Sequence, residues 1–113
     1  MEPTPREVRL YEDASGRCSF DLWLNRLRDL KARAIIRERI ARIMLGNFGD
    51  CKSVGDGVQE IRIAYGPGYR LYYAEDGDTV VVLLCGGTKA AQRADIERAK
   101  AFWVDYKRLA QDA

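Results

Sequence analysis

The residues that could do chemistry in this 113-residue chain gather in two neighbouring segments, 60–73 and 80–89. The first alternates arginine and tyrosine with aliphatic residues, and the second is an aliphatic run that ends at a lysine. Guanidinium groups bind phosphate oxygens as a bidentate fork and aromatic rings stack on unpaired bases, so these residue types favour a nucleic-acid backbone as the ligand. The candidate site residues are Glu60, Arg62, Arg70, Tyr72 and Lys89.

The composition excludes most other kinds of site. The chain has no histidine, which excludes Ser-His-Asp and Cys-His mechanisms and most zinc mechanisms. Cys18, Cys51 and Cys85 lack the paired spacing of a zinc site or a redox motif, so we expect them to be reduced. We expect no cofactor and no metal. No segment has the ~20 apolar residues of a membrane helix and the N-terminus lacks an export signal, so we expect a cytoplasmic protein without a membrane partner.

The net charge of +2 conceals a concentrated basic segment between residues 26 and 42. Seven basic side chains there stand against two acidic ones. The segment is either a solvated helical face or a surface that grips ribosomal RNA or DNA through counterion release.

Hydrophobic spacing predicts one α+β domain over residues 1–113, with the element order βααβββα. The apolar period changes from helical to alternating after residue 49, so a helical hairpin precedes three consecutive strands. We expect a small, mainly antiparallel four-stranded sheet on which the helical hairpin and a C-terminal helix pack. The predicted strands cover residues 7–11, 58–64, 69–74 and 80–85, and the predicted helices cover 20–30, 36–46 and 96–110.

Alternation within the strand hairpin predicts which side chains share a face, because successive residues of a strand point to opposite faces. The residues expected on the face away from the core are Glu60, Arg62, Ala64, Arg70 and Tyr72. We expect Ala64 opposite Arg70, across a five-residue connection. Two interpretations of this face stay open: a cradle for phosphates, or solvated side chains on the open face of a sheet.

Two glycine motifs lie close to these candidates. The segment 66–68, Gly-Pro-Gly, is interpreted as a tight turn, because no helix with a Lys-Ser/Thr start follows it. The pair Gly86 and Gly87 either allows close approach of a ligand before Lys89 or only ends the strand.

Short motifs follow one another along nearly the whole chain. They are Phe20-x-x-Trp23-Leu24, Ile40-x-Arg42, Gly46–Lys52, Val54–Ile63, Gly66–Tyr73 and Leu83–Ile96. In this order they resemble the RelE/ParE superfamily of bacterial toxins, and within it the HigB-like "addiction module killer" branch. The resemblance implies a RelE-like fold.

The resemblance also implies a function. Such a chain is the toxin of a type II toxin-antitoxin system, and its cognate antitoxin usually carries a helix-turn-helix domain. Operator DNA is then bound only through the antitoxin. Many members enter the ribosomal A site and cut messenger RNA by attack of the ribose 2′-hydroxyl on the adjacent phosphate. The implied activity is a metal-independent endoribonuclease, an mRNA interferase, that inhibits translation and growth; the implied partners are the antitoxin, the ribosome and messenger RNA.

Individual roles follow from the same resemblance. Arg70 is suited to hold the scissile phosphate, and Lys89 is suited to the leaving oxygen or the transition-state charge. Arg62 is too basic to act as a base and is expected to be an electrostatic clamp. Glu60 is either the base or a partner that positions the arginines. The residues expected to bind RNA are Lys52, Tyr72, Gln92 and Arg93.

The chain departs from the pattern of RelE at two places. RelE has two lysines on the second strand, where this chain has Glu60 and Arg62, and a catalytic tyrosine near the start of the last helix, where this chain has Asp95. Two alternatives to the nuclease therefore stay open. One is a ParE-like poison of DNA gyrase, and the other is an RNA-binding module without activity.

Overall fold

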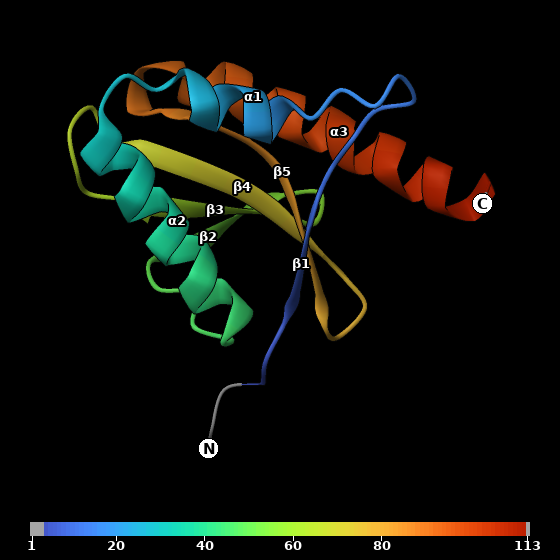
Figure 1. The fold of residues 1–113 in the computed structure, drawn as a ribbon. Helices are drawn as coiled ribbons and strands as arrows, with labels where there is room; N and C mark the ends of the chain where they lie inside the picture. Colours follow the sequence, from blue (N-terminus) through green and yellow to red (C-terminus); the bar gives the residue numbers. More distant parts are fainter. Residues whose placement is uncertain (1–3, 113) are drawn as a thin grey trace.

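The computed structural model of the chain describes residues 4–112. These residues form five strands, three α-helices and one short 3₁₀ helix (Figure 1). In chain order the elements are β1 Glu7–Leu10, α1 Ser19–Arg26, α2 Leu30–Met44, β2 Cys51–Gly55, β3 Val58–Ile63, β4 Tyr69–Asp76, β5 Val80–Thr88, η1 Lys89–Ala91 and α3 Gln92–Asp112. None of the helices in the described part of the chain is both long enough and apolar enough to cross a membrane.

The sheet is mixed and has five strands in the order β1-β5-β4-β3-β2. β1 runs parallel to β5, and the other neighbours are antiparallel. The prediction of four strands was wrong, because β2 is an exposed edge strand with little apolar content. Asp56 and Gly57 connect β2 to β3 with φ angles of 56° and 84°, the left-handed conformations that a tight hairpin turn requires. This Asp-Gly pair was the sequence signal for the missed hairpin.

The second helix of the hairpin begins earlier than its apolar spacing indicates, and the first ends at Arg26 rather than at residue 30. α2 starts at Leu30 rather than at residue 36, because Asp29 caps it. The Asp29 carboxylate accepts hydrogen bonds from the backbone N–H groups of Lys31 and Ala32 at 3.0 and 3.1 Å. Such a cap satisfies donors that have no partner inside the helix. α1 and α2 together provide the apolar side chains that cover one face of the sheet.

The second face of the sheet is covered as well. Ala99 and Trp103 of α3 pack there in an apolar cluster with residues of β3, β4 and β5, including Val58, Tyr72 and Cys85. Of the two interpretations of the face that carries Arg62 and Arg70, the open face of a sheet was therefore wrong. α3 lies over this face, so the candidate site lies between a helix and a sheet.

The hairpin of β3 and β4 has the predicted facing but not the predicted register. Ile63 pairs with Tyr69, and Arg62 pairs with Arg70, so Ala64 does not lie opposite Arg70. The connection still has five residues, but it covers 64–68 because Tyr65 N–H already bonds back to the Ile63 carbonyl at 2.9 Å. Moving the loop by one residue shifts the register by two and leaves every side chain on its predicted face.

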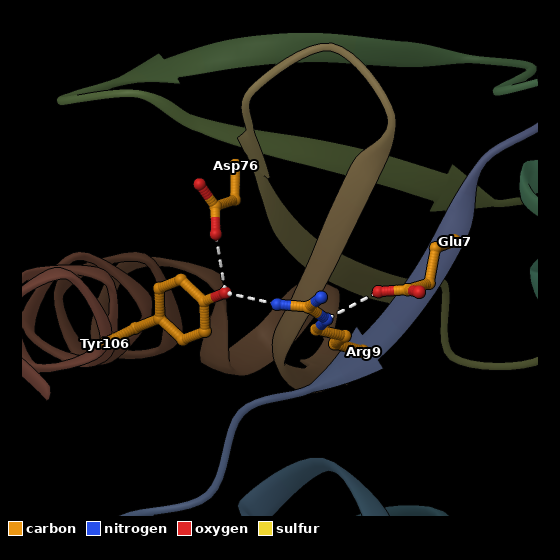
Figure 2. Close-up of polar contacts among 4 residues, drawn as sticks. All are labelled: Glu7, Arg9, Asp76 and Tyr106. Atoms are coloured by element: carbon orange, nitrogen blue, oxygen red, sulfur yellow. Dashed lines mark hydrogen bonds and ion pairs between the residues drawn. The ribbon is translucent and has the colours of Figure 1, made fainter. Parts of the chain in front are cut away.

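A polar network fixes the C-terminal half of α3 to the sheet (Figure 2). The Tyr106 hydroxyl donates to Asp76 at the end of β4 at 2.7 Å. Arg9 of β1 donates to the same hydroxyl at 3.4 Å and to the Glu7 carboxylate at 2.5 Å. One turn of α3 is thereby tied to two strands that are not neighbours in the sheet.

Candidate nucleic-acid interface

Two arginines face each other across the middle of the candidate site. Arg62 of β3 and Arg70 of β4 are direct cross-strand partners, and Gly87 of β5 pairs with Arg70 on the other side. Directly paired residues project from the same face, here the face that α3 covers. Like charges placed directly opposite one another destabilise a sheet. The pairing therefore concentrates positive charge at a cost in stability.

The carboxylate that offsets this charge is completely buried. Glu60 is 0% exposed. It accepts hydrogen bonds from Gln92 Nε2 at 2.8 Å, from Arg62 Nε at 3.1 Å and from the Tyr72 hydroxyl at 3.1 Å. The three donors come from three different elements, so Glu60 links β3, β4 and the first turn of α3.

These contacts decide the charge state of Glu60. Burial is the largest single influence and by itself raises the pKa of the carboxyl. The hydrogen bonds from Gln92, Arg62 and Tyr72, with the charge of Arg70, outweigh burial and hold the pKa below its ordinary value. An ionised carboxylate with its oxygens engaged is suited to position Arg62 rather than to remove a proton.

Tyr72 is part of the interior of this site. Its ring is 0% exposed, and its hydroxyl donates to Glu60. Burial first, and then the neighbouring charge of Glu60, raise the pKa of the phenol. The ring has no free face on the surface for a base to stack on, and its contact orients the carboxylate.

Arg70 and Lys89 are the cations of the site that stay available to an external anion. Arg70 is partly exposed, and its buried Nε atom has no hydrogen-bond partner among the described residues. Lys89 is exposed and lies against the turn between β3 and β4, where its backbone N–H donates to the Gly68 carbonyl at 2.8 Å. Neither side chain is in an ion pair within residues 4–112. We call Arg62, Arg70 and Lys89 the cation cluster, and Glu60 is the carboxylate that accompanies it.

The remaining predicted residues come from β2 and from the start of α3. Lys52 is the cross-strand partner of Glu60 and is exposed. Gln92 and Arg93, at the start of α3, line an open hollow of about 320 Å³ together with Ile96 and Glu97. A basic margin therefore lies beside the buried carboxylate.

Gly86 and Gly87 have a packing role that neither sequence interpretation included. The strand continues through both residues to Thr88. A Cβ on Gly86 would overlap the ring of Trp23 from α1, and a Cβ on Gly87 would overlap the carboxylate of Asp95 from α3. The two glycines admit side chains from helices on opposite faces, so they do not leave space for a ligand.

Asp95 is a residue of this region to which the sequence assigned no role. It is 8% exposed, and its Oδ2 atom is buried without a hydrogen-bond partner among the described residues. Its Oδ1 atom accepts from Arg98 at 3.3 Å. Burial raises the pKa of the carboxyl, and the charge of Arg98 offsets only part of that rise. The signal was available, because Asp95 lies on the same helical stripe as the buried Ala99 and Trp103.

Comparison with known proteins gives one family model and a relative of similar sequence. Residues 23–102 match the family model described as "Phage derived protein Gp49-like (DUF891)". A protein of Haemophilus influenzae, itself described only as an uncharacterized protein, is 51% identical over 82 residues. That match covers 73% of this chain and 83% of the relative. The segment that matches the family model includes every residue of the cation cluster.

Proposed function

The chain belongs to the Gp49-like family, a family of toxin-like proteins from addiction modules, and we propose that it cuts messenger RNA on the ribosome. The family implies an antitoxin as partner. Within the proposal the chain is a RelE/ParE-type toxin of the HigB-like branch, it acts in the cytoplasm, and its antitoxin carries the helix-turn-helix domain that binds operator DNA.

The observation that supports this proposal most is the direct pairing of Arg62 with Arg70 on one face of the sheet. A fold that only needed stability would not place two guanidiniums opposite each other. A phosphate between or beside them removes the repulsion and gains charge-assisted hydrogen bonds. The exposed ammonium of Lys89 at the same end of the sheet adds a third cation for the same anion.

The proposed reaction is a transfer within the RNA backbone. The ribose 2′-oxygen forms a bond to the adjacent phosphorus, the bond from phosphorus to the 5′-oxygen breaks, and a 2′,3′-cyclic phosphate remains. The 2′-hydroxyl loses its proton and the departing 5′-oxygen gains one. Arg70 and Arg62 stabilise charge on the non-bridging oxygens, and Lys89 stabilises charge on the 5′-oxygen. Glu60 holds Arg62 in place.

Binding of the flanking nucleotides is assigned to the basic margin. Lys52 is an exposed cation paired with Glu60 across neighbouring strands, and Arg93 is an exposed cation next in the chain to Gln92, which donates to Glu60. Contacts of this kind set the register of a nucleic acid without reading its sequence. The cut therefore depends on alignment of one phosphate with Arg70.

Induced expression of the wild type, Arg70→Ala and Arg37→Ala in growing cells tests the proposal. Arg37 is an exposed arginine of α2, away from the cation cluster, and serves as the matched control. We expect growth arrest with new 5′ ends in translated messenger RNA for the wild type and Arg37→Ala, and neither effect for Arg70→Ala. Arrest with DNA breaks trapped on gyrase, and no new RNA ends, would instead identify a ParE-like poison. If expression of the wild type does not arrest growth, the remaining interpretation is an RNA-binding module without activity.

A further inference from the structure

Two adjoining hollows form a groove between α1 and α3. Their volumes are about 210 and about 330 Å³, and both are lined by Arg17, Ser19 and Arg98. Further lining residues include Asp13, Leu22, Trp23, Arg26, Leu27 and Phe102. We call this surface the α1–α3 groove. The cation cluster contributes none of these lining residues.

The rim of the α1–α3 groove is positively charged. Arg17 and Arg26 are exposed and form no ion pair within the described part of the chain. Arg98 has a single ion pair, inside α3. The acidic lining residue Asp13 is engaged in its own loop, where Oδ1 accepts from the N–H groups of Ser15 and Arg17 at 2.9 and 3.0 Å. The groove therefore offers the guanidiniums of Arg17 and Arg26, unpaired within residues 4–112, against one carboxylate, Asp13, among its lining residues.

The floor of the groove is apolar but does not suit a nucleobase. The Trp23 ring packs onto Gly86 of β5. The Phe102 ring stacks on Tyr11 with 4.8 Å between ring centroids. Bases bind single-stranded RNA sites by stacking on free ring faces, and the Phe102 ring is already in contact with both Tyr11 and the Arg98 guanidinium, which lies 5.9 Å from its centroid. The combination of Trp, Phe, Leu and Arg side chains is instead typical of the centre of a protein interface.

The groove and the RNA-binding margin lie on different flanks of α3. Arg93 lines the hollow beside the cation cluster, and Arg98 lines the groove. The two residues are five positions apart, which is about 140° around a helix. Substitutions in the groove can therefore be made without touching the residues assigned to RNA.

We propose that the α1–α3 groove is the docking site for an acidic, amphipathic segment of the antitoxin. Apolar side chains of that segment lie on Trp23 and Leu27, and its carboxylates pair with Arg17, Arg26 and Arg98. The identity of the partner rests on the proposed function, whereas its acidic and amphipathic character rests on the lining of the groove. Charge complementarity of this kind steers association and makes it dependent on salt.

The test uses the product of the reading frame adjacent to the gene for this chain, co-expressed with the full chain. The groove variant is Arg17→Glu with Arg26→Glu. The matched control is Arg28→Glu with Arg37→Glu, which makes the same change in charge at two exposed arginines outside the groove. Growth with and without the co-expressed product, and the dissociation constant of the purified pair at two salt concentrations, are measured for each.

We expect the groove variant to arrest growth alone as the wild type does, to escape rescue, and to bind the product at least tenfold more weakly. The control keeps both rescue and affinity. Rescue and affinity equal to wild type in the groove variant would overturn the proposal. So would loss of toxicity with affinity retained, because the groove would then serve the toxic target, and so would absence of binding to the wild type. If the wild type does not arrest growth but binds the product, and only the groove variant loses that binding, the result would contradict the nuclease proposal and support the groove as the docking site.

Discussion

Arg62 lies directly opposite Arg70 on paired antiparallel strands, on the face of the sheet that α3 covers. Only Arg62 has a carboxylate bonded to it, because Glu60 accepts from its Nε atom while Arg70 forms no ion pair among the described residues. Glu60 therefore holds Arg62 in place, and Arg70 keeps hydrogen-bond donors for an anion.

Arg70→Ala should abolish toxicity and leave the fold intact. Removing one of two opposed like charges relieves a repulsion of about 0.2–1 kcal/mol, while Glu60 loses some favourable charge, so the two effects nearly cancel. We expect the free energy of unfolding in urea to stay within about 1 kcal/mol of wild type. Arg70→Lys serves as control, because it keeps the charge but not the bidentate fork. A collapse in stability would show that Arg70 is structural.

Glu60→Ala should destabilise the protein strongly. The substitution leaves the buried hydroxyl of Tyr72 and the partly buried donors of Arg62 and Gln92 without their acceptor, and an unsatisfied buried donor costs about 1–3 kcal/mol. Unfolding in urea at pH 7 measures this loss of stability. Glu38→Ala removes an exposed ion pair with Arg42 and should cost only about 0.5 kcal/mol. Equal effects of the two substitutions would contradict the role given to Glu60.

Glu60 should also make stability depend on acid. Its pKa in the folded state is lowered, so its contribution is present above the ordinary pKa of glutamate and is lost as pH falls through the folded value. Glu60→Gln should therefore flatten the acid limb of the stability curve. Unfolding in urea across pH 3 to 7 is the measurement, and a limb as steep as that of wild type would contradict this prediction.

Asp95 should have the opposite effect on the pH dependence of stability. Burial raises the pKa of its carboxyl, so its contribution is complete below the ordinary pKa of aspartate and is lost as pH rises through the folded value. Asp95→Asn keeps an acceptor for Arg98 and removes the ionisation. We expect the stability of the variant relative to wild type to be greater at pH 7 than at pH 3.5. A difference that does not change with pH would contradict the assignment.

Gly87→Ala should be damaging because of Asp95 in particular. The added Cβ overlaps the Asp95 carboxylate, and overpacking of this kind costs about 1–3 kcal/mol. Gly87→Ala with Asp95→Ala should cost less than the sum of the single substitutions, with a coupling of at least about 1 kcal/mol in a double-mutant cycle. Gly86→Ala is the control, because it meets Trp23 on the other face and should be additive with Asp95→Ala.

The sequence predicts the shared face of Arg62 and Arg70 because the period of a strand is two, and the structure agrees. It does not predict their register, since that depends on hydrogen bonds inside the 64–68 turn. The burial of Glu60 could not be predicted either. A carboxylate within an alternating strand is typical of an exposed position, and one of its donors, Gln92, lies 32 residues away in the chain.

The position of α3 explains the remaining difference. The buried stripe of α3 includes Asp95 as well as Ala99 and Trp103. Because Asp95 is polar, the apolar spacing in the sequence makes this buried stripe look shorter than it is. The same helix covers the face for which an open surface was one of two interpretations, and it leaves Arg70 and Lys89 at its margin. Sequence spacing identified the cations, and packing decided which of them stay available.

The most direct test is cleavage in a translation reaction reconstituted from purified ribosomes and factors. The messenger holds a ribosome with an empty A site, and 5′ ends are mapped after addition of the purified chain. We predict new ends within the A-site codon that require the ribosome, at a rate at least ~100-fold lower for Arg70→Ala. Absence of ends from a wild type that still arrests growth, or equal cleavage by Arg70→Ala, would contradict the account.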